Sequence, residues 1–196
     1  MPEKTYDEIP TKRDNILTAA RNLFAEKGYE ETTIADIAKL AGVAVGTVYL
    51  YFHNKHDVYT AVGLDIELKL AQAFQDSSLL ELPMREVIRT MIDASFRSSR
   101  HYKQFMSLLQ TDMQSPDEIR QHREIDDKVT QAIDALLRHA INKGELAAFN
   151  TAMYAEILNC AAGSVIHQCF VVEDGEREEQ YRTYLIEFIE RLFFGP

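Results

Sequence analysis

The sequence predicts an all-α protein of about nine helices, with a small N-terminal helix-turn-helix domain followed by a larger helical ligand-binding and dimerisation domain. Apolar residues recur three and four positions apart along almost the whole chain, which is the spacing of one helix face. No segment alternates apolar and polar residues as a half-buried strand does. We place the first domain at residues 1–57 and the second at residues 58–196.

The N-terminal domain is expected to contain three helices. The first covers residues 12–27, and Gly28 follows it as a stop signal. The second begins at Thr33, which forms a capping-box pair with Asp36 three residues later. The third is short and covers residues 45–51.

The C-terminal domain is expected to supply the other helices. Asn54 and Asp57 cap the first of them, and Pro116 is typical of a first helical position. Apolar stripes then place the helices at residues 58–74, 84–95, 102–113, 116–143, 151–171 and 176–194.

The N-terminal pattern is that of a helix-turn-helix. A capped short helix, a turn at Gly42 and a second short helix make up this motif, and its second helix enters the major groove of DNA. Val48 and Phe52, four residues apart, are expected to form the buried face of that helix and to leave Tyr49 open. Geometry alone also allows an ordinary helical corner.

The residues at these positions favour the helix-turn-helix over the ordinary helical corner. Residues 33–43 (TIADIAKLAGV), residues 46–52 (GTVYLYF) and Lys55 closely resemble the TetR/AcrR family of transcriptional regulators, with a match over residues 16–62. The resemblance implies a homodimer that binds a palindromic operator in double-stranded DNA, usually as a repressor that a small ligand releases. Beyond this motif only the helical architecture is similar.

Thr33 and Lys55 each stand at a helix start, where free backbone N–H groups favour a phosphate. A lysine in the first turn opposes the helix dipole, and a bound anion would reverse that effect. The resemblance implies that Thr33, Thr47, Tyr49 and Lys55 contact the DNA backbone. The full set of expected DNA-binding residues is Thr33, Ala44, Val45, Gly46, Thr47, Tyr49, Leu50 and Lys55.

The third helix is poor in base-reading side chains. Ala44 offers no side-chain N-cap, which weakens the helix by about 1 kcal/mol. Residues 44–47 contain no Arg, Lys, Asn or Gln, the side chains that pair bidentately with bases. We therefore expect thymine-methyl contacts from Ala44 and Val45 and recognition of DNA shape. Cations on the N-terminal side would reach phosphates: Lys4, Lys12 and Arg13.

The net charge of −10 does not exclude this site. Residues 1–60 hold seven Lys and Arg against nine Asp and Glu, a net charge of −2, and residues 61–196 carry the other −8. Most of the repulsion for phosphates therefore lies outside the N-terminal domain.

The last two helices are expected to form the dimer. In the family they pair with their counterparts in a four-helix bundle, and residues 154–172 are apolar and rich in small residues. Two operator half-sites also require two helix-turn-helix domains, one from each subunit. The alternative is an ordinary monomer core.

The middle helices are expected to enclose a small apolar or amphipathic effector. The resemblance of residues 42–44 and 49–52 to the fatty-acid-responsive, FadR-like branch implies a fatty acyl-CoA. Taken singly, each candidate residue is more often part of a core than a ligand contact. The expected pocket residues are Phe96, Tyr102, Phe105, Met106, Leu109 and Met113.

Other classes of function find little support. No phosphate loop, nucleophile motif or metal-ligand spacing occurs, so we expect neither an enzyme nor a metal or cofactor. No run of 18 apolar residues and no N-terminal apolar stretch occurs, so we expect a cytoplasmic protein with no membrane role. A helical interaction module, or an activator without a small-molecule effector, stays as the alternative.

Overall fold

The computed structural model describes residues 11–111 and 116–195, with the side chains of residues 104–111 excepted. Chain contacts divide it into two units, residues up to Asp65 and residues from Ile66 on, and each is described by itself. The division falls inside the fourth helix. The elements are α1 (Lys12–Glu31), α2 (Ile34–Ala41), α3 (Val45–Tyr51), α4 (Lys55–Ala73), the 3₁₀ turn η1 (Ser77–Glu81), α5 (Met84–Thr111), α6 (Pro116–Asn142), α7 (Thr151–His167), the π-helical turn η2 (Gln168–Val172) and α8 (Glu178–Phe194).

The described residues thus contain eight α-helices where the sequence predicted about nine. Residues 84–95 and 102–113 were expected to form separate helices, and α5 consists of two helical segments that meet at a kink at Tyr102, where the second helix was expected to begin. The backbone leaves helical geometry only at Tyr102 (φ −120°, ψ 22°). Residues 96–101 contain no glycine or proline that could stop the helix between the two stripes.

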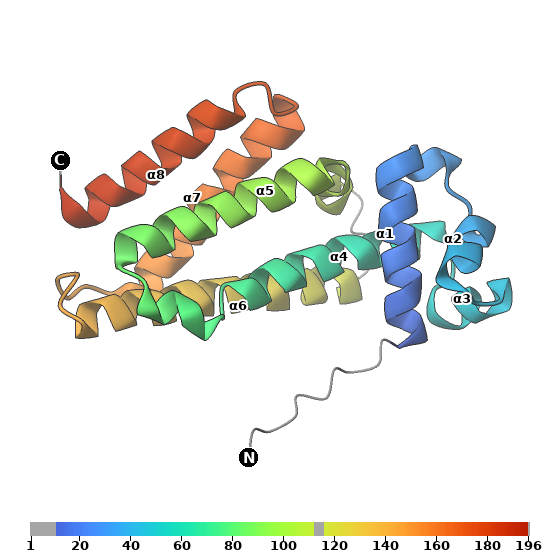
Figure 1. Ribbon diagram of the computed structural model, residues 1–196, viewed down its shortest axis with the longest axis horizontal. Coiled ribbons are helices and arrows are strands. Elements are labelled where there is room, and N and C mark those ends of the chain that lie inside the picture. Colours follow the sequence, from blue (N-terminus) through green and yellow to red (C-terminus); the bar gives the residue numbers. More distant parts are fainter. Residues whose placement is uncertain (1–10, 112–115, 196) are drawn as a thin grey trace, which may run out of the picture. The chain divides into compact units, whose positions relative to one another are not determined.

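In the first unit α1 supports the two short helices, and it lies beside α2 and α3 in Figure 1. It buries Ile16, Ala20 and Phe24 completely. Gly42 ends α2 in the left-handed conformation (φ 68°), which a glycine adopts without strain. The axes of α2 and α3 then differ by 102°, the angle of a helix-turn-helix.

Three aromatic rings join α1 to the start of α4. The ring centroid of Tyr59 lies 4.9 Å from that of Phe24 and 4.9 Å from that of Tyr29, in both cases edge to face. Burial raises the pKa of Tyr59 well above its ordinary value, so its phenol stays protonated. The first turns of α4 therefore belong to the core of the first unit.

In the second unit α5, α6, α7 and α8 surround one core, with α8 alongside α5 in Figure 1. Phe96 and Leu137 are fully buried there, and the ring of Phe96 packs edge to face against Phe170 at 5.8 Å. Asn159 of α7 donates hydrogen bonds to Asp126 (2.7 Å) and Thr130 (3.1 Å), which lie one turn apart on α6. These contacts fix the antiparallel register of α6 and α7.

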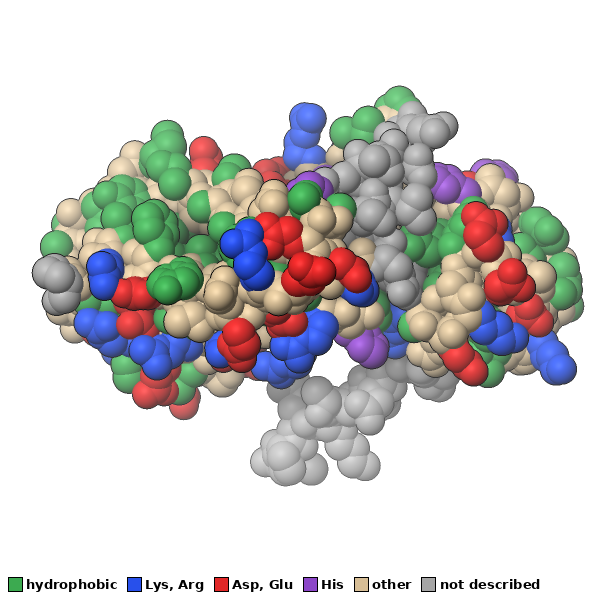
Figure 2. Space-filling view, turned by 90° about the horizontal axis from the view of Figure 1, so that it is seen from above, with side chains coloured by type: hydrophobic (Ala, Val, Ile, Leu, Met, Phe, Trp, Pro, Cys, Tyr) green, Lys and Arg blue, Asp and Glu red, His purple; other side chains and the backbone are tan. Residues whose placement is uncertain are grey.

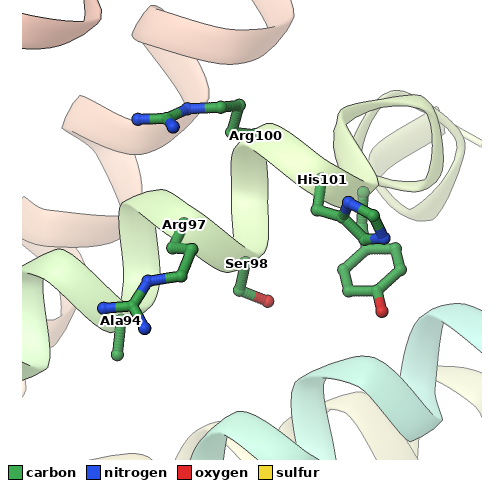
Figure 3. Close-up of a pocket in the computed structure, with 6 residues that line it drawn as sticks. Ala94, Arg97, Ser98, Arg100 and His101 are labelled. Carbon is green, nitrogen blue, oxygen red and sulfur yellow. The ribbon is translucent and has the colours of Figure 1, made fainter.

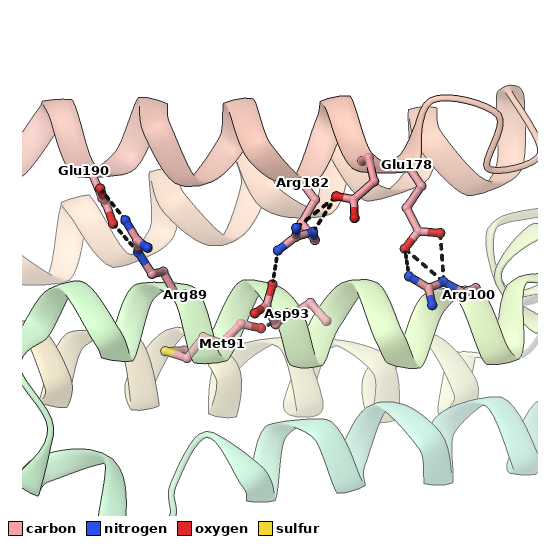
Figure 4. Close-up of polar contacts among 9 residues, drawn as sticks. Arg89, Met91, Asp93, Arg100, Glu178, Arg182 and Glu190 are labelled. Carbon is pink, nitrogen blue, oxygen red and sulfur yellow. Dashed lines mark hydrogen bonds and ion pairs between the residues drawn. The ribbon is translucent and has the colours of Figure 1, made fainter.

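Ion pairs on the surface hold α5 against α8 (Figure 4). The Nε atom of Arg89 donates to Glu190 over 2.7 Å, and this bond keeps the pKa of Glu190 below its ordinary value. Because solvent screens such exposed pairs, their main effect is to set the register of the two helices. The pairs are Arg85 and Arg89 with Glu190, Asp93 with Arg182, Arg100 with Glu178, and Lys103 with Asp174.

Residues Thr151–Val172 form a long apolar helical stretch. By length and composition alone this stretch could cross a membrane, and 28% of its most apolar 18-residue window is buried. A helix in the core of a soluble protein meets the same criteria, and Asn159 here bonds to a carboxylate of α6. One side of this helix is apolar because it packs in the core of the second unit, and its other side is an exposed apolar face.

Candidate nucleic-acid interface and effector cavity

The short helix α3 presents most of its side chains to solvent. It buries Val48 completely, and Phe52 at its C-terminal end is 5% exposed, as the sequence predicted. By contrast Tyr49 is 52% exposed and Leu50 is 82% exposed. Val45 and Tyr51 are exposed as well. Such an apolar and aromatic surface marks a binding site more often than a free surface.

The start of α3 leaves room for a close approach. Ala44 is the N-cap residue and makes no side-chain capping bond, as expected, while Thr47 is half-buried and follows in the first turn. A Cβ atom built on Gly46 would have no neighbour within 4 Å. Since glycine inside a helix costs about 1 kcal/mol relative to alanine, the fold gains nothing from it. The residue suits a surface that another molecule approaches closely.

Thr33 is held by the capping box that its spacing predicted. Its hydroxyl accepts a hydrogen bond from the Asp36 N–H (3.1 Å), and its own N–H donates to the Asp36 carboxylate (3.3 Å). The Thr33 hydroxyl also bonds to that carboxylate, and these contacts lower the pKa of Asp36. The helix start at which we expected a phosphate thus already carries an ionised side chain.

Lys55 has a role inside the protein. Its Nζ donates to the carbonyl oxygens of Tyr29 (2.7 Å) and Glu30 (3.1 Å) and lies 4.3 Å from the centre of the Tyr29 ring. These carbonyls belong to the last turn of α1, where a cation is favourable. These contacts explain why a lysine stands at the start of α4 without a bound phosphate.

We expect Lys55→Met to lower the free energy of unfolding by about 1–2 kcal/mol, because two hydrogen bonds to a charged donor are lost. Urea denaturation followed by circular dichroism measures this change. Lys39→Met is the matched control, since Lys39 is an exposed lysine on α2. Its effect should stay within about 0.5 kcal/mol. Equal losses for the two variants would contradict the capping role.

A cavity of about 580 Å³ lies beside α5 in the second unit, which is the size of a small-molecule site. In Figure 3 Arg97, Ser98 and His101 extend from one side of α5, while Arg100 turns toward α8 and its partner Glu178. The lining residues are Ala94, Arg97, Ser98, Arg100, His101 and Tyr102.

This lining differs from the apolar pocket that we expected. Tyr102 lines the cavity, but Phe96 lies in the core against Phe170 instead. The side chains of Phe105, Met106 and Leu109 lie outside the described residues, as does Met113. The spacing of positions 94, 98 and 101, which continues the stripe of Val87 and Met91, was the signal that could have identified the polar residues.

The outer sides of α7 and α8 carry large exposed apolar side chains, which gather on this part of the surface in Figure 2. They recur four residues apart on each helix. Because the two helices run antiparallel around the connection at residues 168–177, Ile157 and Phe188 lie at similar distances from it. We call the surface the α7–α8 face: Met153, Ile157, Tyr184, Phe188 and Leu192.

An exposed α3 held at 102° to a capped α2 defines a helix-turn-helix DNA-binding protein. A family model described as bacterial regulatory proteins, tetR family, matches residues 16–62. A second, the tetracyclin repressor-like C-terminal domain, matches residues 83–192. The chain therefore belongs to the TetR family of bacterial transcriptional regulators, which are not enzymes.

Individual relatives agree with this family. The HTH-type transcriptional regulator YerO of Bacillus subtilis is 30% identical over 94% of this chain and 65% of its own length. A fatty acid metabolism regulator protein of the same organism is 29% identical over 67% of this chain and 69% of its own. The structure of FadR from Bacillus subtilis in complex with stearoyl-CoA superposes with a TM-score of 0.67, 22% identity and coverage of 93% and 98%. The chain spans about two thirds of the length of the two curated relatives, and the FadR likeness concerns the fold.

Proposed function

We propose that the protein represses transcription in the cytoplasm by placing α3 in the major groove of operator DNA. The observation that carries this proposal is the open surface of α3, with Tyr49 and Leu50 more than half exposed while Val48 fixes the helix from below. The proposed DNA contacts are Thr33, Ala44, Val45, Gly46, Thr47, Tyr49, Leu50 and Lys55. Since α3 carries no Arg, Lys, Asn or Gln, base recognition relies on thymine methyl groups and DNA shape.

The repressor acts as a homodimer on a palindromic operator. The α7–α8 face supports this, because it is apolar, exposed and built from two adjacent helices. A two-fold interface buries the same patch on both subunits, and large aromatic residues such as Tyr184 and Phe188 are typical anchors. Two copies of α3 would then read two half-sites.

A small amphipathic effector releases the repressor from DNA. The cavity beside α5 supports this part of the proposal, since its volume of about 580 Å³ falls in the range of small-molecule sites. The FadR neighbour was solved with stearoyl-CoA, so a fatty acyl-CoA is the first effector to test.

Retardation of DNA by the purified protein tests the proposal. The fragment is the region upstream of its own gene, and a random-sequence duplex is the control. Binding that weakens steeply as salt rises is expected, because phosphate contacts release counterions. Absence of binding at low salt, to the upstream fragment and to random DNA pools alike, would refute a DNA-binding function. A reporter gene downstream of the bound site distinguishes repression from activation.

Gly46→Ala should separate stability from DNA binding. The substitution adds a methyl group in open space, so the free energy of unfolding should rise by about 0.5–1 kcal/mol. Affinity for the operator should fall at least about tenfold, which corresponds to about 1.4 kcal/mol, because the methyl group meets the DNA surface. Denaturation and fluorescence anisotropy with labelled DNA measure the two effects. Unchanged affinity would place Gly46 outside the interface.

A further inference from the structure

We infer that the cavity beside α5 holds the anionic group of an amphiphilic effector, a carboxylate or a phosphate, with Arg97 as its principal partner. This inference rests on the effector-released repressor proposed above and specifies the chemistry of its ligand. The residues that carry it are Arg97, Ser98 and His101, which all line the cavity.

The charge pattern of α5 singles out Arg97. Among the cations of α5 whose side chains the structure describes, four form ion pairs with α8 or with the connection that precedes it: Arg85, Arg89, Arg100 and Lys103. Arg97 has no ion pair or hydrogen bond with any described residue. Figure 3 shows it on the side of the cavity, away from the direction taken by Arg100. Within the described part of the chain, the guanidinium is therefore available to a ligand.

The neighbouring side chains suit an anion. Ser98 and His101 follow Arg97 at one and four positions along the helix and offer a hydroxyl and a ring N–H. Among the described residues, none of the six that line the cavity is acidic. Arginine binds carboxylate and phosphate groups through two parallel N–H bonds, so a single arginine with two such neighbours can orient an anionic head.

The face of α5 that borders the cavity continues toward the start of the helix as an apolar stripe. Val87 is 2% exposed within the core, and Met91 packs partly buried against it. At Ala94, Ser98 and His101 the stripe faces the cavity instead. Ser98 and His101 thus place polar side chains where the core stripe reaches the cavity, which suits a polar ligand group.

Four amphiphiles with one tail and different heads test the inference by isothermal titration calorimetry on the full chain: decanoate, decyl phosphate, 1-decanol and decyltrimethylammonium. We expect at least one of the anions to bind at least tenfold more tightly than the alcohol and the cation. The tighter anion then identifies the head group as carboxylate or phosphate. Failure of both anions to bind, or an alcohol that binds equally well, overturns the anion site.

Arg97→Gln should weaken binding of the tighter anion about 10- to 100-fold and leave binding of the alcohol unchanged, because only a charged hydrogen bond is lost. Arg85→Gln is the matched control, since it removes the same charge from α5 on the side of α8. Equal weakening by both variants overturns the inference. DNA retardation in parallel keeps the two proposals apart. If decanol releases the protein from DNA but the anions do not, the effector-released repressor stands and the anion site is refuted. If an anion binds through Arg97 but does not release the DNA, the anion site stands and the effector-released repressor is refuted.

Discussion

Ile157→Glu is expected to convert the proposed dimer to a monomer. Ile157 is 57% exposed at the centre of the α7–α8 face, and dimerisation would bury the new charge. A buried unpaired charge costs roughly 3–5 kcal/mol, and a two-fold interface contains it twice. The dissociation constant of the dimer should therefore rise at least about a thousandfold. Sedimentation velocity over a concentration series measures this change.

Ile119→Glu is the matched control for this prediction. Ile119 is 44% exposed on α6, outside the α7–α8 face, and the chemical change is identical. It should leave the dimer intact. Operator binding should fall with dimerisation in the first variant only, because a monomer engages one half-site. If both variants stay dimeric, the interface lies elsewhere on the molecule.

Val48→Asp is expected to unfold the helix-turn-helix. Val48 is 0% exposed and is the residue of α3 that is buried against its unit. An aspartate there places a charge in an apolar site without a partner, which costs roughly 3–5 kcal/mol and exceeds what three short helices can tolerate. Thermal unfolding followed by circular dichroism should begin at a much lower temperature, and DNA retardation should disappear.

Leu50→Asp provides the comparison on the same helix. Leu50 is 82% exposed, so its thermal unfolding should match that of the unchanged protein while DNA binding falls through repulsion of phosphates. Similar thermal destabilisation of the two variants would show that α3 lies differently against α1 and α2.

The local features of the fold could be predicted because short-range chemistry determines them. The Thr33–Asp36 capping box and the Asn54 side chain that accepts the Asp57 N–H (2.9 Å) both follow from spacing alone. Gly42 and the uncapped Ala44 follow from residue type. The buried pair of Val48 and Phe52 follows from helical periodicity.

The features that sequence reasoning missed depend on residues far apart. Lys55 bonds to carbonyl groups 25 and 26 residues earlier, so its stabilising role could not be inferred from its position in α4. Phe96 and Tyr102 were grouped as bulky residues, but only the packing of α5 on η2 decides that Phe96 joins the core. Arg97 was overlooked because an arginine on a helix is ordinarily solvated.

The ion pairs between α5 and α8 have a consequence for communication between subunits. Together with the buried contacts beneath them they hold the two helices in one register, so that a shift of α5 carries α8 with it. One side of α5 borders the cavity, and α8 supplies Tyr184, Phe188 and Leu192 to the proposed dimer face. Occupancy of one cavity would therefore alter the geometry that the second subunit meets. This arrangement favours cooperative release, with a response to effector concentration steeper than that of two independent sites.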